Sequence, residues 1–286
     1  MLNTTVKRRH TMEAFNPDDW VGRTQSRSDQ FHSAHVRKIA ATFDHPAPED
    51  GQELPWLWHW CFFDDCAAQQ SLGPDGHPRL GDFMPPAHSR NRMWAGSRVN
   101  FIQPLLVGAQ AQRRTTLKHI EEKHGRTGSL LFVTLSHEVW QGQQLCVREE
   151  QDIVYREPTP PKASAGQVAP EVDWHETVTP DPLLLFRYSA LTFNAHRIHY
   201  DWPYVTKAEG YPGLVVHGPL TATLNLAAFI RANPLAHVRS FSFRAARPLI
   251  APAAFHLSGR HERHGYAELW ASDHNGINQY ANVEFD

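Results

Sequence analysis

The sequence of 286 residues lacks several features that mark large classes of protein. Its three cysteines, Cys61, Cys66 and Cys146, show no metal-ligand spacing, so we expect reduced thiols and no disulfide framework. No segment approaches the roughly 18 consecutive apolar residues of a membrane helix. Nor does an apolar segment follow the basic residues 7–10, as a secretory signal requires. These absences favour a cytoplasmic protein without a membrane partner.

An excess of charge of one sign is also missing. The chain has 28 Lys and Arg against 30 Asp and Glu, a net charge of −2. A general nucleic-acid-binding protein normally carries a basic stripe, so we expect no nucleic-acid partner. Histidine is plentiful, at 19 residues, but no cysteine or acidic partners complete a ligand set with the closely spaced pairs. We therefore predict no metal site.

One stretch is unusually dense in polar, titratable side chains, and it lies between apolar segments at 183–186, expected to be strand-like, and 220–230, expected to be helical. Burying such groups is costly unless they are paired or used, so their density predicts a functional site. The stretch and the His-Gly pair that follows it contain these residues: Asn194, His196, His199, Asp201, His217 and Gly218.

Each of these residues also has a structural explanation. A lone histidine is commonly packed or on the surface, an asparagine such as Asn194 often forms a turn, and Asp201 could cap a helix that begins near Pro203. Their combination favours catalysis instead. Histidine can exchange protons near neutral pH, which makes His199 the candidate general base. A helix that starts at Pro219 would leave free N–H groups near Gly218 for a carbonyl that gains negative charge.

The remaining sequence predicts two similar halves. Helices are expected at 29–43 and 54–70, the second aromatic and buried, with an aromatic ligand cage as the functional alternative. The proline-rich residues 158–170 predict an extended linker between halves at 1–157 and 171–286. One apolar helix followed by antiparallel strands in each half indicates an α+β duplication. The patterns of alternation and turns predict strands at 98–107, 110–120, 129–140, 145–155, 239–249, 266–271 and 277–285.

The dense stretch resembles the signature of the MaoC-type, hot-dog-fold (R)-specific enoyl-CoA hydratases and dehydratases. That signature runs Ser-Gly-Asp-x-Asn-Pro-x-His and is followed by a segment ending in His-Gly. Here Asn194 replaces the Asp and His196 replaces the Asn of the signature. The run from Ser189 to Asp201 is most similar to one branch, the mesaconyl-C4-CoA and itaconyl-CoA hydratases and their mitochondrial dehydratase relatives. The resemblance covers nearly the whole chain, including residues 56–60, 73–78 and 92–96.

This resemblance implies a double hot dog, in which each half is a sheet wrapped around a central helix. It implies an acyl-CoA substrate, no cofactor, and a motif-bearing second half beside a non-catalytic first half. Asn194, His199 and Gly218 would be catalytic, as water holder, base and oxyanion donor, with support from His196, Asp201 or His217. A dicarboxylic acyl group would also need a cation for its free carboxylate. The candidates for that contact are Arg90, Arg92, Arg197, Arg244 and Arg247.

The activity that the resemblance implies is reversible hydration of a small enoyl-CoA, such as itaconyl-CoA or mesaconyl-C4-CoA. A 3-hydroxyacyl-thioester dehydratase of fatty-acid synthesis is the first alternative. A hot-dog thioesterase is the second, and the third is an inactive acyl-CoA-binding module, suggested by Asn194 in place of the usual Asp. A monomer of the duplicated chain and a homodimer are both compatible with the sequence.

Overall fold

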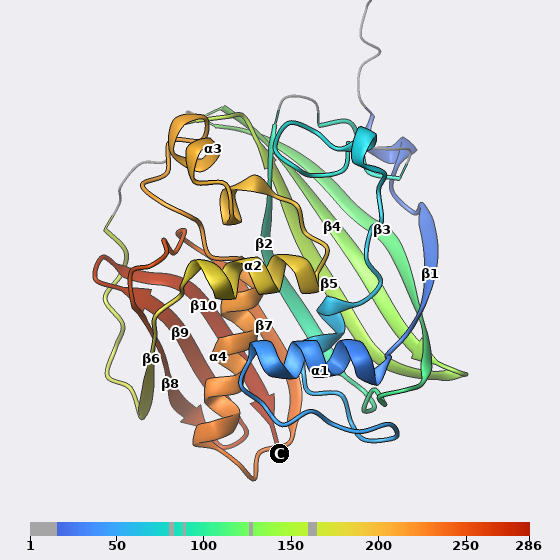
Figure 1. Cartoon of the computed structure of the whole chain (residues 1–286), viewed down its shortest axis with the longest axis vertical. Coiled ribbons are helices and arrows are strands. Elements are labelled where there is room, and N and C mark those ends of the chain that lie inside the picture. Colours follow the sequence, from blue (N-terminus) through green and yellow to red (C-terminus); the bar gives the residue numbers. More distant parts are fainter. Residues whose placement is uncertain (1–15, 80–82, 88–89, 126–127, 160–164) are drawn as a thin grey trace, which may run out of the picture.

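The computed structural model describes residues 16–79, 83–87, 90–125, 128–159 and 165–286. Its main feature is one antiparallel sheet of ten strands, in the order β1-β3-β4-β5-β2-β7-β10-β9-β8-β6 (Figure 1). The first half contributes β1 (Thr24–Gln30), β2 (Asn91–Phe101), β3 (Gln110–Gly125), β4 (Gly128–Gln141) and β5 (Gln144–Arg156). The second half contributes β6 (Trp174–Val178), β7 (Val238–Ala245), β8 (Phe255–Arg263), β9 (Tyr266–Asp273) and β10 (Gly276–Phe285).

The strand order shows the duplication directly. From the outer edge to the centre, β1-β3-β4-β5-β2 has the same order of connection as β6-β8-β9-β10-β7. The innermost strands β2 and β7 pair antiparallel, with Gly96 opposite Arg244 and Asn100 opposite Ser240, and so join the halves into one sheet. The expected α+β double hot dog is confirmed, with two departures: the halves form one continuous sheet, and the helix expected at 54–70 of the first half does not form.

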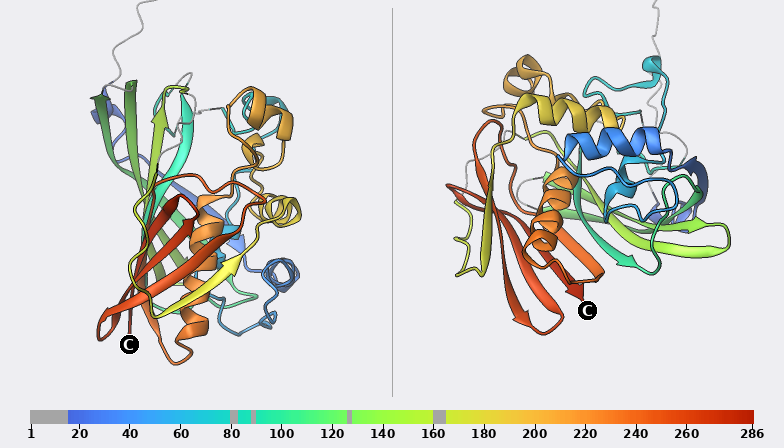
Figure 2. Two further views of the ribbon diagram at one scale, coloured as in Figure 1. Left: turned by 90° about the vertical axis from the view of Figure 1, so that its left-hand side faces the viewer. Right: turned by 60° about the horizontal axis from the view of Figure 1, so that its bottom comes forward.

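The helices lie on one face of this sheet (Figure 2). They are α1 (Ser33–Thr42), α2 (Pro182–Leu191), α3 (Trp202–Lys207) and α4 (Gly218–Ala232). Helix α4 packs on all five strands of the second half and on β2, whereas α1 packs against α2. Because the apolar residues of α4 surround the helix rather than forming one stripe, it suits this enclosed position. Short 3-10 turns occur at Pro17–Asp19, Trp58–Cys61, Gln69–Ser71 and Arg197–His199.

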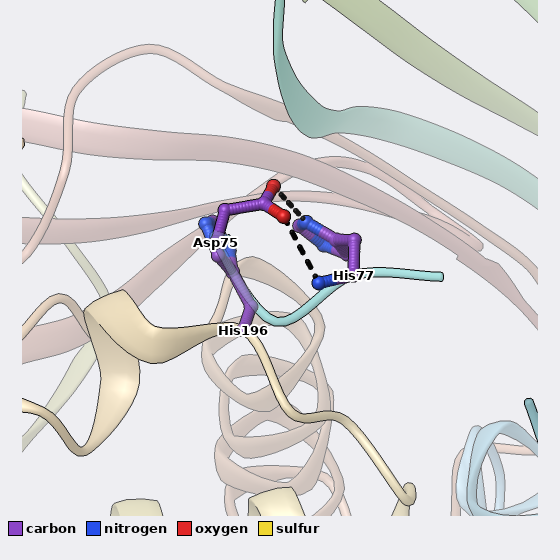
Figure 3. A group of neighbouring side chains, drawn as sticks. All are labelled: Asp75, His77 and His196. Atoms are coloured by element: carbon purple, nitrogen blue, oxygen red, sulfur yellow. Dashed lines mark hydrogen bonds and ion pairs between the residues drawn. The ribbon is translucent and has the colours of Figure 1, made fainter. Parts of the chain in front are cut away.

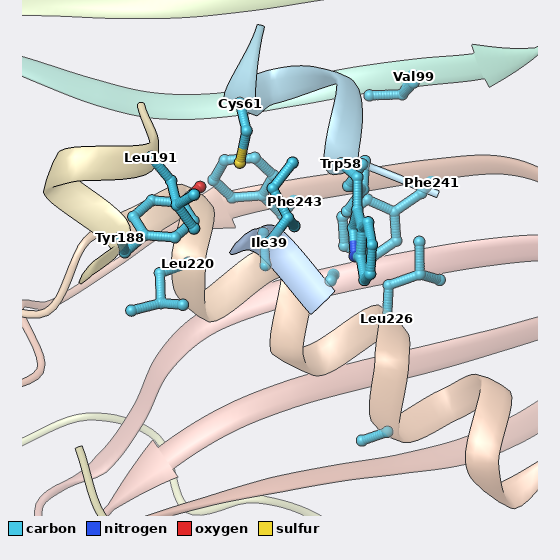
Figure 4. Close-up of a cluster of buried hydrophobic side chains, with 14 of the residues drawn as sticks. Ile39, Trp58, Cys61, Val99, Tyr188, Leu191, Leu220, Leu226, Phe241 and Phe243 are labelled. Carbon is cyan, nitrogen blue, oxygen red and sulfur yellow. The ribbon is translucent and has the colours of Figure 1, made fainter. Parts of the chain in front are cut away.

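The main hydrophobic core is continuous across the two halves. Around α4, the side chains of Ile39 from α1, Trp58, Tyr188 from α2 and Phe241 from β7 converge (Figure 4). Phe241 and Tyr188 are each only 1% exposed. Each fully buried aromatic side chain stabilises the fold by on the order of 1.5–3 kcal/mol relative to exposure, so the helices that carry the site are fixed to the sheet.

The helix predicted at 54–70 is wrong. This segment is a folded loop that contains only the 3-10 turns at Trp58–Cys61 and Gln69–Ser71. Leu57 and Phe63 have left-handed backbone angles, with φ of 69° and 61°, which interrupt any regular helix. Apolar content alone misled the prediction, because these aromatic residues are buried by tertiary packing rather than by helical periodicity.

Other predicted elements also need correction. Residues 183–186 are not strand-like but belong to α2, where Asp181 accepts a hydrogen bond from the Leu184 N–H at 2.7 Å and Pro182 occupies the first turn. The helix predicted at 29–43 begins only at Ser33, because Asp29 belongs to β1 and pairs with Ala111 of β3. The strands predicted at 98–107 and 239–249 are Asn91–Phe101 and Val238–Ala245.

Other predictions agree with the structure. The helix at 220–230 is confirmed within α4, and the turns at residues 141–144 and at Asn275-Gly276 each join two paired strands. In the linker predicted at 158–170, residues 160–164 lie outside the described residues, and the rest has no helix or strand. The division at that linker stays a prediction. No helix in the described part of the chain combines the length and apolar character needed to cross a membrane.

Candidate active site

A cavity of about 2020 Å³ lies where the two halves meet, and most of the predicted site residues line it. The second half supplies the motif from Asn194 to His199 and the start of α4. The first half supplies parts of β2 and β5 and the loop at residues 73–78. The residues of the cavity wall that carry the candidate chemistry are His77, Arg92, Asn194, His196, His199, His217 and Gly218.

The end of α2 sets the position of Asn194. Phe193 adopts a left-handed backbone, with φ of 47°, and the Asn194 N–H donates to the Ser189 carbonyl at 2.8 Å. The Asn194 side-chain Oδ1 accepts from the His196 N–H at 3.0 Å. Among the described residues the amide NH₂ of Asn194 has no hydrogen-bond acceptor and can donate to a ligand, but this group cannot take up a proton.

The imidazole of His199 is held in one orientation. Its Nδ1 donates to the Val215 carbonyl at 2.7 Å, which leaves Nε2 as the acceptor. Burial lowers the pKa of His199 to about 4, although the hydrogen bond to Val215 opposes the shift. The residue is therefore neutral at pH 7 and able to accept a proton.

His217 supports His199 and leads into α4. The two imidazoles stack with ring centroids 3.6 Å apart, and His217 Nε2 bonds to the Ser189 hydroxyl at 2.8 Å. His217 is the N-cap of α4 but makes no side-chain capping hydrogen bond. The N–H of Gly218, at the first position of the helix, has no acceptor within that helix, which suits it to bind a developing oxyanion.

The loop at residues 73–78 adds two residues that were not predicted, Asp75 and His77. The Arg197 N–H donates to the Asp75 carbonyl at 2.8 Å, and Gly76 packs so closely that a Cβ there would lie 1.8 Å from the Ala195 carbonyl oxygen. The loop at residues 73–78 therefore packs tightly against the motif at residues 194–199. Its Gly and Pro content predicted a loop but gave no sign of where it docks.

Asp75, His77 and His196 form a compact cluster (Figure 3). Their side-chain N and O atoms lie within 4.8 Å of one another, a spacing that could also hold a metal ion. The Asp75 carboxylate already accepts from His77 Nδ1 at 2.8 Å and from the His77 backbone N–H at 3.1 Å. These hydrogen bonds account for the short Asp75–His77 distances.

Asp201 does not join the site. Its carboxylate caps α3 by accepting from the Tyr204 N–H at 3.1 Å and pairs with Arg197 at 2.8 Å, and it does not line the cavity. The capping role considered for this residue is therefore observed. His196, in contrast, lies in the cavity wall between His77 and His199, with ring centroids 4.1 and 5.3 Å away.

The five arginine candidates differ in their environment. Arg90 pairs with Glu122 away from the cavity, and Arg244 lies over the Tyr280 ring, also away from it. Arg197 and Arg247 are held by carboxylates, at 2.8 Å from Asp201 and 3.3 Å from Asp273. Arg92 of β2 is half-buried, lines the cavity and makes no hydrogen bond or ion pair with any residue that the structure describes.

Two solved structures with low sequence identity share the fold. HtdX of Mycobacterium tuberculosis matches with a TM-score of 0.68 and 21% identity, over 92% of this chain and 100% of that one. A MaoC-like dehydratase of Phytophthora capsici matches with a TM-score of 0.70 and 13% identity, over 95% and 98% of the two chains. Both likenesses support the double hot-dog fold.

Sequence comparison identifies the family. The family described as hydroxyacyl-thioester dehydratase type 2 matches residues 57–251. The mesaconyl-C4-CoA hydratase of Chloroflexus aurantiacus is 48% identical over 84% of this chain and 88% of its own length. The mitochondrial hydroxyacyl-thioester dehydratase type 2 of Schizosaccharomyces pombe is 29% identical over 67% and 72%. The chain therefore belongs to the hydroxyacyl-thioester dehydratase type 2 family, whose members are hydro-lyases.

Proposed function

We propose that this hydro-lyase reversibly hydrates a branched C5 dicarboxylyl-CoA, with mesaconyl-C4-CoA as the first candidate and itaconyl-CoA as the second. The observation that carries the proposal is Arg92, a half-buried cation in the cavity wall without a partner among the described residues. Leaving a cation partly desolvated is costly unless a ligand supplies the counter-charge. The free carboxylate of a dicarboxylyl group matches the guanidinium fork. The 48% identity to a mesaconyl-C4-CoA hydratase supports the same substrate class.

The residues of the motif divide the reaction among them. In hydration, His199 Nε2 takes a proton from water while the water oxygen bonds to the β-carbon, and the Asn194 amide helps to hold that water. The electrons of the double bond move toward the thioester, whose oxygen becomes enolate-like and is bound by the Gly218 N–H. The α-carbon must then receive a proton, which Asn194 cannot supply.

Replacing Arg92 with glutamine tests the substrate class. A charge-assisted hydrogen bond typically contributes about 1.5–3 kcal/mol, so we expect KM for mesaconyl-C4-CoA to rise roughly tenfold or more. KM for crotonyl-CoA, which has no free carboxylate, should change little. Steady-state kinetics with both substrates measure the ratio.

The matched control is Arg244→Gln, because Arg244 is exposed and does not line the cavity. This variant should leave both KM values near those of the wild type. Equal effects of Arg92→Gln on the two substrates would show that Arg92 does not recognise the free carboxylate.

The size of the cavity favours a second candidate. A volume of about 2020 Å³ exceeds the roughly 300–1,000 Å³ of most small-molecule sites, and it also extends along β3, β4 and β5 of the first half. A dehydratase acting on longer 3-hydroxyacyl thioesters would use that room. This candidate predicts that kcat/KM rises with the length of a straight acyl chain.

We also propose that the enzyme is located in the cytoplasm, as the sequence indicates.

We propose that the enzyme acts as a monomer of the duplicated chain or as a homodimer. A single hot dog pairs its sheet with that of a second copy, and here β2 and β7 already make that junction within one chain. Sedimentation of the purified protein distinguishes the monomer from the dimer.

A further inference from the structure

We propose that His77, held by Asp75, exchanges the proton at the α-carbon of the acyl group, while His199 exchanges the proton of water. This inference rests on the proposed hydration reaction and names its second proton-transfer group. Such a group is needed because Asn194, a neutral amide, cannot exchange a proton. The first half of the chain would then contribute a catalytic residue from the loop at residues 73–78.

The Asp75–His77 pair has the geometry of an oriented base. The Asp75 carboxylate accepts from the ring Nδ1 at 2.8 Å and from the backbone N–H at 3.1 Å (Figure 3). Because an ionised carboxylate only accepts hydrogen bonds, Nδ1 must carry the ring proton, and Nε2 keeps its lone pair. A carboxylate in this position fixes the tautomer and stabilises the imidazolium formed when Nε2 takes a proton. His199 has only the Val215 carbonyl in the corresponding position.

The loop places His77 in the same cavity as the motif. His77 lines the cavity, and its ring centroid lies 4.1 Å from that of His196, which is itself 5.3 Å from that of His199. The contact between Gly76 and the Ala195 carbonyl holds this spacing. His77 and His199 therefore reach the cavity from different halves, an arrangement that lets them act on different atoms of one substrate.

The surroundings of His77 favour its neutral form, the form that begins the dehydration direction. Burial and the charge of Arg92 lower the pKa of His77, whereas Asp75 and Glu209 oppose the shift. Although burial of Asp75 would raise its pKa, the hydrogen bonds from His77 hold the pKa of this carboxyl below its usual value. A neutral imidazole beside an ionised carboxylate is the form that can remove a proton. The charged and titratable groups near His77 are Asp75, Arg92, His196, His199 and Glu209.

The proposed roles give a balanced reaction in the dehydration direction. His77 Nε2 takes the α-proton, and the electrons of the broken C–H bond form an enolate at the thioester, held by the Gly218 N–H. These electrons then form the C=C bond as the β-carbon–oxygen bond breaks. The departing hydroxide takes a proton from the imidazolium form of His199, which is the minor form at pH 7, and leaves as water. Hydration follows the same steps in reverse: neutral His199 takes the proton of water, and the imidazolium form of His77, stabilised by Asp75, gives its proton to the α-carbon. Exchange with solvent then restores both imidazoles.

Isotope exchange separates the two roles. The hydrated product, a 3-hydroxyacyl-CoA, is incubated with full-length enzyme in D₂O. Deuterium at the α-carbon is followed by mass spectrometry, and loss of water by enoyl-thioester absorbance. We expect His77→Gln to slow both processes by about a hundredfold or more. His199→Ala should slow the loss of water but keep α-exchange. His264→Gln, at an exposed histidine outside the cavity, is the matched control and should behave as the wild type.

Three results would overturn the proposal. The first is α-exchange at the wild-type rate in His77→Gln, and the second is loss of exchange in His199→Ala, which would give both transfers to His199. The third is activity lost to EDTA and restored by zinc, which would make the Asp75 cluster a metal site. Asp75→Asn provides a second test in case His77→Gln does not fold. This variant should slow α-exchange about tenfold or more and shift the acid limb of the pH profile. If the wild type prefers a straight-chain substrate, the same assay with that substrate tests His77 independently of the dicarboxylate proposal.

Discussion

Replacing His199 with alanine is expected to lower kcat for hydration by about a hundredfold to ten-thousandfold, the usual contribution of a general base. The reason is geometric: the Val215 carbonyl fixes Nδ1 as the donor, and only Nε2 can accept the proton of water. Stopped-flow or steady-state measurement of enoyl-thioester absorbance gives the rate. Crotonyl-CoA should show the same loss as a dicarboxylyl substrate, since His199 acts on the water and not on the acyl group.

The pH dependence gives His199 a signature that a purely structural residue lacks. Because burial lowers its pKa to about 4, His199 remains neutral, and hence active as a base, above that pH. His199 should therefore cause no fall in the hydration rate near pH 6.5, the ordinary pKa of histidine. The rate should fall only as the pH approaches 4, where His199 becomes protonated. Wild-type rates retained by a folded His199→Ala protein would contradict the assignment. His264→Ala, at an exposed position, is the control.

Replacing Gly218 with proline is expected to lower kcat by about a hundredfold to a thousandfold, the usual cost of losing one oxyanion donor. Proline removes the N–H but suits the first turn of a helix, and His217 before it already has an extended backbone, with φ of −63° and ψ of 133°. The loss should therefore appear in kcat rather than in folding. Thermal unfolding measured beside kcat separates the two effects.

Gly218→Ala is the matched control, because alanine keeps the N–H. A Cβ at position 218 would lie 3.7 Å from its nearest neighbour, the Trp94 carbonyl oxygen, which is an ordinary contact. Alanine should thus retain most of the activity. A Gly218→Pro protein as active as Gly218→Ala would mean that the oxyanion is bound elsewhere.

Much of this arrangement could be predicted from local sequence patterns. Alternating apolar residues and short turns gave most of the strands, since each pattern reflects which face of a strand is buried. The apolar run at 220–230 gave α4. The spacing of Asn194, His199 and Gly218 indicated the candidate site, because these residues lie in the segment from the end of α2 to the start of α4.

The features that the sequence did not reveal depend on contacts between distant segments. The aromatic residues of 54–70 are buried by packing against α1 and the sheet, so their apolar character did not indicate a helix. The Asp181-Pro182 cap that starts α2 was a usable local signal that the strand prediction overlooked. The role inferred for His77 depends on a loop of the first half that docks on Ala195, more than a hundred residues away, and no local pattern predicts that contact.

The measurement that tests the proposed function most directly is the rate of enoyl-thioester absorbance change with purified full-length enzyme on mesaconyl-C4-CoA, itaconyl-CoA, crotonyl-CoA and a longer straight-chain enoyl-CoA. The account predicts the highest kcat/KM for one of the two dicarboxylyl substrates, and a preference over crotonyl-CoA that Arg92→Gln reduces roughly tenfold or more. A kcat/KM that instead rises with straight-chain length, unaffected by Arg92→Gln, would contradict the proposal and favour a fatty-acyl dehydratase.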